Sequence, residues 1–550
     1  MKKNLLLSFI FISPYFVFSQ DNLGEIHGNF ETNLQSYNED LSIEAEEADE
    51  IILNNAYLNI LYNKGNFSAG LRYESYLNAL KDYDPQYKGN GIPYRFASYS
   101  TDGLEVTVGS FYEQFGSGLI FRTYEDKGLG VDNAMDGIRL KYSPISGLYL
   151  KSFIGKSRTY FDYSEGILRG ADAEFNINEA LNLDIKTNYI LGGSFVSRFQ
   201  EDKNPVFNLP QNVSAMSGRI NIIRGGLYYY GEYAYKINDP VGAFTMDKNN
   251  YATGSAIVNN ITYSQRGFGI SFESHRVDHM EFRSERAKEK EFIINYIPSL
   301  SKLHAYTLMA LYPCATQPEG EIGFQTDLFY KIEKGTLLGG KYGTKIDMNF
   351  SRTNSLNGGN SFLNDSNEHT PMLISFKGEE LYFSDFNIEI YKKLSNKTRV
   401  NLLISKQKYN KDILEGKTKG EYGIINSTIG VIDISYKIKQ GHTLRVELQA
   451  LLSEQEDKNA KYADGDWSMI LAEYTISPNW FFTFQDMYNW GNPYVEKQLH
   501  YSNVSVGYLK GANRFEIGYG KKRAGIFCVG GVCKEVPSSN GLNLNISSSF

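Results

Sequence analysis

Cysteine, proline and long apolar runs are scarce in this sequence. Three cysteines and 14 prolines occur among 550 residues, so a cysteine-rich metal centre or disulfide framework cannot organise the whole chain. The prolines fall in the first 19 residues, in predicted turns and loops, or at strand starts, which leaves the predicted strands uninterrupted. After residue 19, no apolar run reaches the roughly 20 residues that a membrane-spanning helix needs. A chain of this kind can cross a membrane only with strands.

Positive charge is also in deficit. The chain has 56 Lys and Arg against 63 Asp and Glu. If an amino-terminal leader containing Lys2 and Lys3 is removed, the net charge is 54 − 63 = −9. This balance argues against nucleic acid as a partner. Because no linker, composition break or sustained helical period divides the chain, we expect one large domain.

The amino-terminus has the pattern of a secretory leader. Lys2 and Lys3 precede an apolar run from Leu5 to Phe18, and Ser19 supplies the small residue that signal peptidase needs. We therefore predict that residues 1–19 are a cleaved signal peptide and that residues 20–550 form the exported domain, which passes through the periplasm.

Alternating apolar and polar residues follow the leader. Residues 26–35 alternate in this way, and so do residues 67–74, where Arg72 and Glu74 share the polar face. A period of two predicts strands with one face toward lipid and the other toward water. The 41 tyrosines and 34 phenylalanines suit a membrane barrel, because aromatic rings collect at its two interfaces.

Short turn signals recur between these strands. They lie at residues 63–66, 101–103, 144–147, 178–180, 224–225, 266–267, 298–302, 334–335, 395–397, 440–441, 478–479 and 510–511. Twelve hairpins with a first and a last strand predict about 26 strands, with a range of 22–26. The expected fold is all-β: a single closed antiparallel transmembrane β-barrel with short periplasmic turns and long extracellular loops.

The last ten residues support this fold. Leu542, Leu544, Ile546 and Phe550 fall on one face of a strand, with asparagines and serines on the other. This ending resembles the carboxy-terminal signal that the outer-membrane assembly machinery recognises, with Phe550 as the terminal aromatic. The resemblance implies the outer membrane of a Gram-negative bacterium as the location, with outer-membrane lipid and the assembly machinery as partners.

Four features together carry a family resemblance: the leader ending Phe18-Ser19-Gln20, the tyrosine-rich strands, the glycine-rich segment 115–133 and the segment 311–343. In these features the chain resembles a family of uncharacterised, porin-like outer-membrane β-barrel proteins from Bacteroidota. The resemblance implies a barrel over most of the exported chain. It implies no catalytic residues.

One long loop, residues 114–136, mixes glycines, apolar groups and charges. A porin often folds one loop into its lumen as a constriction, where paired charges set a transverse field. The candidate constriction residues are Glu113, Arg122, Glu125, Asp132 and Asn133. The alternative is a loop that packs over its neighbours for stability.

Charges of both signs are expected to line the lumen. The candidate lumen-lining residues are Arg72, Glu74, Gln325, Asp327, Lys331, Lys341, Lys345 and Asp347. Such a mixture favours a wet lumen or an internal salt-bridge network over a strongly ion-selective pore.

Signals for metal or redox chemistry are few. Cys528 and Cys533 flank Val-Gly-Gly-Val and are predicted to form a disulfide in an oxidising compartment, whereas Cys314 has no assigned role. The acidic residues between Glu39 and Glu50 could hold calcium, but their spacing matches no known calcium loop, so a solvated loop is the expectation. No metal site and no cofactor is predicted.

Two functions of different class remain open. In the first, the barrel is a porin-like passive channel for small polar solutes, since a ring of this many strands encloses more space than side chains fill. In the second, it is a non-conducting subunit that scaffolds surface lipoproteins or an envelope assembly or secretion complex. A third hypothesis is a phospholipase-like enzyme, because His500 and Ser502 resemble the His-x-Ser pair of the outer-membrane phospholipase family. The neighbouring strand shows no polar partner for this pair, and we expect that the protein is not an enzyme.

Overall fold

The computed structural model describes residues 24–203, 209–240, 251–286, 288, 292–356, 378, 380–463, 465–529 and 532–550. The predicted signal peptide lies outside these residues. Within them, no helix is long and apolar enough to span a membrane, a finding that says nothing of a β-barrel.

Twenty-four strands form one sheet. They are β1 Glu25–Gln35, β2 Leu53–Lys64, β3 Phe67–Asn78, β4 Gly89–Thr101, β5 Leu104–Phe111, β8 Met135–Ile145, β9 Leu148–Thr159, β10 Asp162–Asn176, β11 Thr187–Phe199, β12 Asn212–Arg224, β13 Leu227–Pro240, β14 Tyr251–Gln265, β15 Phe268–Asp278, β16 Gly320–Ile332, β17 Thr344–Asn354, β18 Leu381–Lys393, β19 Thr398–Asn410, β20 Ile424–Lys439, β21 His442–Gln455, β22 Trp467–Ile476, β23 Trp480–Tyr488, β24 His500–Lys510, β25 Asn513–Lys522 and β28 Ser539–Ser549.

The remaining elements are short and lie in the connections. They are the 3-10 helices η1 Leu41–Ile43, η2 Pro85–Tyr87 and η4 Val495–Lys497, the helices α1 Ile177–Ala180 and α2 Lys411–Leu414, and the two-stranded pairs β6 Glu125–Asp126 with β7 Val131–Asp132 and β26 Gly525–Val529 with β27 Val532–Val536.

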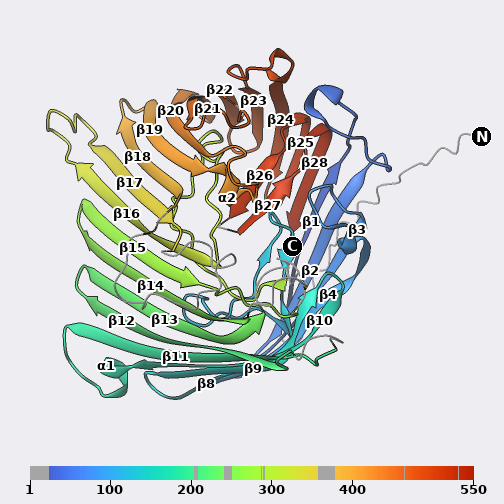
Figure 1. Cartoon of the computed structure of the whole chain (residues 1–550), viewed down its shortest axis with the longest axis vertical. Coiled ribbons are helices and arrows are strands. Elements are labelled where there is room, and N and C mark those ends of the chain that lie inside the picture. The colour runs from blue at the N-terminus through green and yellow to red at the C-terminus, as the bar shows by residue number, and fades with distance from the viewer. Residues whose placement is uncertain are drawn as a thin grey trace, which may run out of the picture.

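The sheet closes on itself. Each barrel strand pairs antiparallel with its neighbours in the chain, and β1 pairs with both β2 and β28, with Asn29 opposite Ser549 at the seam. Figure 1 shows the strands following one another around a ring until the last ones reach the first. The predicted closed antiparallel barrel is therefore confirmed, and 24 strands fall within the predicted range.

The alternating pattern separates the two faces of the wall. Apolar side chains on the outer face remain exposed around the ring, as in Ile138, Phe195, Phe272, Ile404, Leu448 and Ile517. Polar side chains on the opposite face are buried within the barrel, including Asp172, Arg219, Asn349 and Gln449. A pleated strand places consecutive residues on opposite faces, so this separation follows directly from the sequence.

Short connections gather at one edge of the barrel. Two-residue turns such as residues 65–66 and 440–441 lie at this edge, and β1 begins and β28 ends there. Phe550 lies at the seam, because a Cβ built on Gly28 would meet its ring at 2.4 Å. A side chain at position 28 would therefore require the ring of Phe550 to shift.

One predicted turn is wrong. Residues 298–302 do not join two barrel strands but lie inside the long connection from β15 to β16, whose end residues Asp278 and Gly320 pair directly with each other. The apolar residues that suggested strands on either side of this turn are instead buried inside the barrel. Removing this hairpin accounts for the difference between the predicted 26 strands and the observed 24.

Candidate functional site in the barrel interior

Three segments from the long-loop edge enter the barrel. The first inner loop is residues 112–134, between β5 and β8, and the second inner loop is residues 279–319, between β15 and β16. The inner hairpin is residues 525–536, formed by β26 and β27. Figure 1 shows these segments within the ring of strands.

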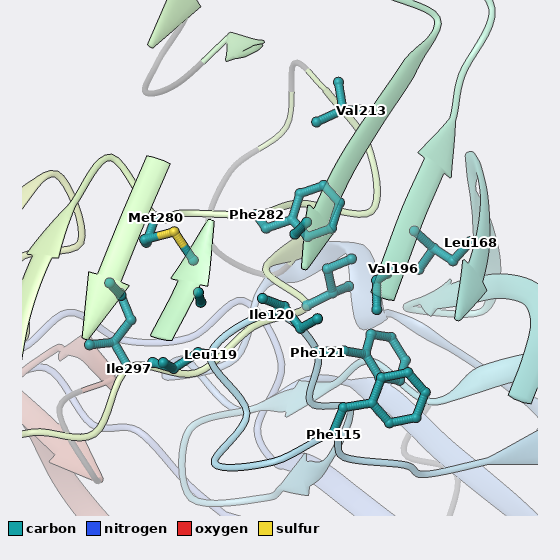
Figure 2. Packing of buried hydrophobic residues seen from close by; sticks show 14 of the residues in the cluster. Phe115, Leu119, Ile120, Phe121, Leu168, Val196, Val213, Met280, Phe282 and Ile297 are labelled. Atoms are coloured by element: carbon teal, nitrogen blue, oxygen red, sulfur yellow. The ribbon is translucent and has the colours of Figure 1, made fainter. Parts of the chain in front are cut away.

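Apolar side chains fasten the two inner loops to one half of the wall. Phe115, Ile120 and Phe121 of the first inner loop and Met280 and Phe282 of the second are at most 2% exposed. They pack against buried aliphatic residues of β10 to β15, namely Leu168, Val196, Val213, Ala215, Ala234, Ala256 and Val277. Figure 2 shows Phe115 and Phe121 side by side, with Leu119 close to Ile297. This part of the interior is dry and packed like a protein core.

A second apolar cluster fastens the end of the second inner loop to the other half of the wall. Leu308 and Met309 are buried, as are Tyr306, Leu311 and Tyr312. Their partners lie on β18 to β23 and include Phe383, Leu403, Ile429, Val431, Leu451, Met469 and Met487. The second inner loop therefore contacts both halves of the wall and spans the space between them.

A buried group of charges holds the first inner loop. Arg158 on β9 donates two hydrogen bonds to Glu74 on β3, at 2.9 and 2.6 Å, and also pairs with Asp132. Arg72 pairs with Glu74 at 2.6 Å, with Glu125 at 2.9 Å and with Asp132. Arg72, Glu74 and Arg158 are at most 4% exposed. Buried charges persist when each has an oppositely charged partner, and these five do.

The structure places the candidate constriction residues in this packed region. Glu113 lies 2.9 Å from Lys151, and Arg122 stacks on Tyr296 with its guanidinium 4.1 Å from the ring centroid. The fully buried Asn133 donates to the carbonyl of Ile293 at 2.8 Å and so joins the two inner loops. Glu125 and Asp132 neutralise the buried arginines instead of facing an open lumen. This packing corresponds to the interpretation in which the loop stabilises its neighbours.

The other candidate lumen-lining residues are spread along β16 and β17. Gln325 and Asn349 both hydrogen-bond Asp327 at 2.7 Å. Lys331 and Lys345 are exposed opposite each other near the short-turn edge, and Asp347 is half-buried. Lys341 requires a correction, because it lies in the connection 333–343 rather than on a strand. The glycines on both sides, at 340 and 343, have positive φ and end the extended pattern.

The inner hairpin is joined to the rest of the interior by its charged and aromatic residues. A disulfide links Cys528 to Cys533, and Lys534 pairs with Asp82 at 3.0 Å and lies over the ring of Tyr83. Phe527 approaches Gly128 in the turn of the first inner loop. The hairpin therefore stands between the wall and the first inner loop.

Two cavities lie on either side of the inner hairpin. The larger, of about 570 Å³, is bounded by the inner faces of β23, β24, β25 and β28 and by the hairpin. The smaller, of about 440 Å³, lies between the hairpin, α2 and the second inner loop. Ile526 and Lys534 line both cavities. The inner hairpin is thus a partition between the two cavities, in the space that the inner loops do not fill.

The acidic loop contributes to the barrel seam. Asp40 caps η1 through Ser42 and pairs with Lys521 at 2.5 Å, and Asn540 donates to it at 3.0 Å. The hydrogen bond from Lys521, supported by Ser42, lowers the pKa of Asp40 to about 2. Within the described residues, no group of three or more His, Cys, Asp or Glu side chains is arranged to hold a metal ion.

The structure also supplies a polar partner for His500 and Ser502. Asp486 on β23 lies directly opposite Ser502, accepts a hydrogen bond from its hydroxyl at 2.5 Å and lies 2.8 Å from Nδ1 of His500. The sequence argument missed Asp486 because it considered only the strand that follows β24 and not the one that precedes it. Ser502 donates to the carboxylate rather than to the imidazole, so the three residues do not form a nucleophile–base pair in this arrangement.

The whole chain, residues 1–550, matches the model of one protein family. The chain belongs to the Family of unknown function (DUF6029). The family match does not indicate which bacterial group the protein comes from, so the expected Bacteroidota origin stays a prediction. Among curated proteins, none matches the chain.

Several solved outer-membrane barrels are similar in overall shape. The P pilus usher PapC translocation pore has a TM-score of 0.46 at 9% identity, covering 95% of this chain and 99% of its own. An E. coli P pilus tip assembly intermediate containing PapC has a TM-score of 0.49 at 9% identity, and the alignment covers 96% of this chain and 62% of that one. Pseudomonas aeruginosa OccK3 has a TM-score of 0.32 at 10% identity, covering 96% of both chains. Similarities this low carry no function from these barrels to this chain.

Glu319, at the end of the second inner loop, should make stability depend on pH. Burial, reinforced by the charge of Glu281, raises its pKa to about 7. Because the folded-state pKa exceeds the unfolded value, ionisation of Glu319 costs no stability below about pH 4.5 and lowers stability progressively as the pH rises to about 7. The full shift corresponds to at most about 3 kcal/mol.

We therefore expect Glu319→Gln to raise the urea midpoint at pH 8 and to leave it nearly unchanged at pH 5. The matched control is Glu333→Gln, at an exposed position in the connection 333–343. Equal effects of the two substitutions at pH 8 would show that the environment of Glu319 does not raise its pKa.

Proposed function

We propose that this protein is an outer-membrane channel for small polar solutes, narrowed by its own inner loops. The exposed apolar outer face supports membrane insertion, because a soluble protein rarely exposes so large a continuous apolar surface. A closed barrel leaves no unpaired sheet edge in lipid, which satisfies the requirement for a membrane-spanning sheet.

The polar cavity beside β23 to β28 is the observation that favours a channel. Gln485, Asn503 and Ser505 face it from β23 and β24, and Asn543 and Asn545 face it from β28. Uncharged amides and hydroxyls can replace part of the hydration shell of a solute without holding it tightly. Of the wall residues that line this cavity, only Met487 and Tyr501 belong to the second apolar cluster or pack against it, and none belongs to the first.

A scaffold without conductance is the second candidate. The dry packing of the second inner loop against both halves of the wall favours it, since that packing closes much of the lumen. In this role the long loops would contact surface lipoproteins or subunits of an envelope complex. Neither role requires a cofactor or a catalytic step.

Single-channel recording in a planar lipid bilayer distinguishes the two. The channel function predicts small, steady current steps from the purified protein in KCl. It also predicts larger steps when residues 526–535, the partition between the cavities, are replaced by a short Gly-Ser turn. Silence from both proteins, once their insertion is verified by heat-modifiable gel mobility, would reject the channel and leave the scaffold.

A further inference from the structure

Unbalanced positive charge gathers at one end of the larger cavity. Lys521 and Lys522 are the last residues of β25, at the long-loop edge, and Arg523 follows them. All three line the cavity, and Lys534 of the inner hairpin faces them. Four cations therefore surround the outer end of the polar cavity.

Three carboxylates near the cavity already form ion pairs, and two of these pairs involve Lys521 and Lys534. Asp82 pairs with Lys534 at 3.0 Å, and Glu516 on β25 pairs with Arg514 at 2.8 Å. Asp40 pairs with Lys521 at 2.5 Å. These three ion pairs leave the positive charges of Lys522 and Arg523 uncompensated at the entrance.

Lys522 and Arg523 differ from the paired cations. Within the described part of the chain, neither has an ion pair with a carboxylate, and Lys522 is exposed. The guanidinium of Arg523 donates to the carbonyl of Ala524 at 3.0 Å and lies 5.9 Å from the ring centroid of Trp467. These contacts orient the guanidinium and leave its charge unpaired.

The wall beneath these cations is open and uncharged apart from the Arg514–Glu516 pair. The inner face of β25 has glycine at positions 518 and 520, and the side chains of Asn503 and Ser505 on the neighbouring strand lie against these glycines. Deeper in the cavity, Asn503, Ser505 and Asn545 offer amides and hydroxyls. An anion attracted at the entrance would therefore meet neutral donors along the wall, which permits both entry and release.

We propose that small anions are the solutes of this channel and that Lys522 and Arg523 select them at its outer mouth. This inference rests on the proposed channel function and adds its substrate class. A single charge at about 7 Å in water changes the ion energy by about RT, so each cation should change local anion occupancy by roughly threefold. The effect should weaken at high salt, because the Debye length is about 10 Å at 0.1 M.

The reversal potential in a KCl gradient tests this inference on the full-length protein. Wild-type channels should prefer chloride to potassium. The double variant Lys522→Gln, Arg523→Gln should lose that preference by roughly threefold or more at 0.1 M salt, while Lys522→Glu should shift it further toward potassium. Lys334→Gln, an exposed lysine in the connection 333–343, is the matched control and should leave the selectivity unchanged.

Each outcome has a distinct meaning. Wild-type current with no preference for chloride would overturn the anion inference and leave the channel intact. Chloride preference that survives in both the double variant and Lys522→Glu would overturn the assignment to these two residues. Absence of current from inserted wild-type protein would overturn the proposed function itself, and the inference with it.

Discussion

Arg158→Ala is expected to destabilise the barrel by about 3–5 kcal/mol, the usual cost of removing one partner from a buried ion pair. Arg158 is 2% exposed and is the main partner of Glu74, which is itself 1% exposed. Without the guanidinium, Glu74 and Asp132 must share Arg72, and one buried carboxylate stays partly unpaired. The first inner loop, which Asp132 anchors, should therefore detach from β9.

This effect can be measured as the urea midpoint in detergent, or as the temperature at which the compact band disappears on a gel. Arg224→Ala is the control, because Arg224 is exposed at the end of β12. The double variant Glu74→Gln, Arg158→Ala should recover part of the loss, since it removes the stranded negative charge. A midpoint for Arg158→Ala equal to that of Arg224→Ala would contradict the role assigned to the buried charges.

Removing the second inner loop should have the largest effect on conductance. Asp278 and Gly320 are already paired, so a short turn can replace residues 281–317 without moving β15 or β16. The deletion would remove the only described segment that belongs to both apolar clusters. We expect a severalfold larger single-channel conductance and a lower unfolding midpoint, because each buried Leu, Met or Phe contributes about 1.5–3 kcal/mol.

A loop shortening outside the lumen is the control for this deletion. Residues 333–343 lie at the short-turn edge, where Leu337 is 98% exposed. Replacing them with a two-residue turn should change neither conductance nor stability much. If both deletions give the same current steps as the wild type, the second inner loop does not restrict the passage.

Much of the barrel could be predicted from residue alternation. Arg72 and Glu74, which alternate with exposed apolar residues, are buried, and the pairing of the last strand with the first agrees with the pattern ending at Phe550. The inner loops could not be predicted in the same way. Apolar residues such as Leu308 and Met309 follow no regular period, because they pack against a curved wall and not along a strand.

For the charged residues of the interior, too, some features could be predicted from the sequence and others could not. Their presence on inward-facing positions was readable from the sequence, but their partners were not. Arg158 and Glu74 are separated by 84 positions in the chain, and Lys534 and Asp82 by 452. Similarly, Asp486 reaches His500 and Ser502 only because β23 and β24 pair in a particular register.

The sequence by itself determined an alternating antiparallel barrel with an apolar exterior, because side-chain direction along a strand depends only on position in the chain. The tertiary structure alone decided which long connections turn inward, which charges neutralise one another and where unpaired cations remain. Those outcomes depend on contacts between distant segments, and such contacts are fixed only when the sheet closes and brings the segments together.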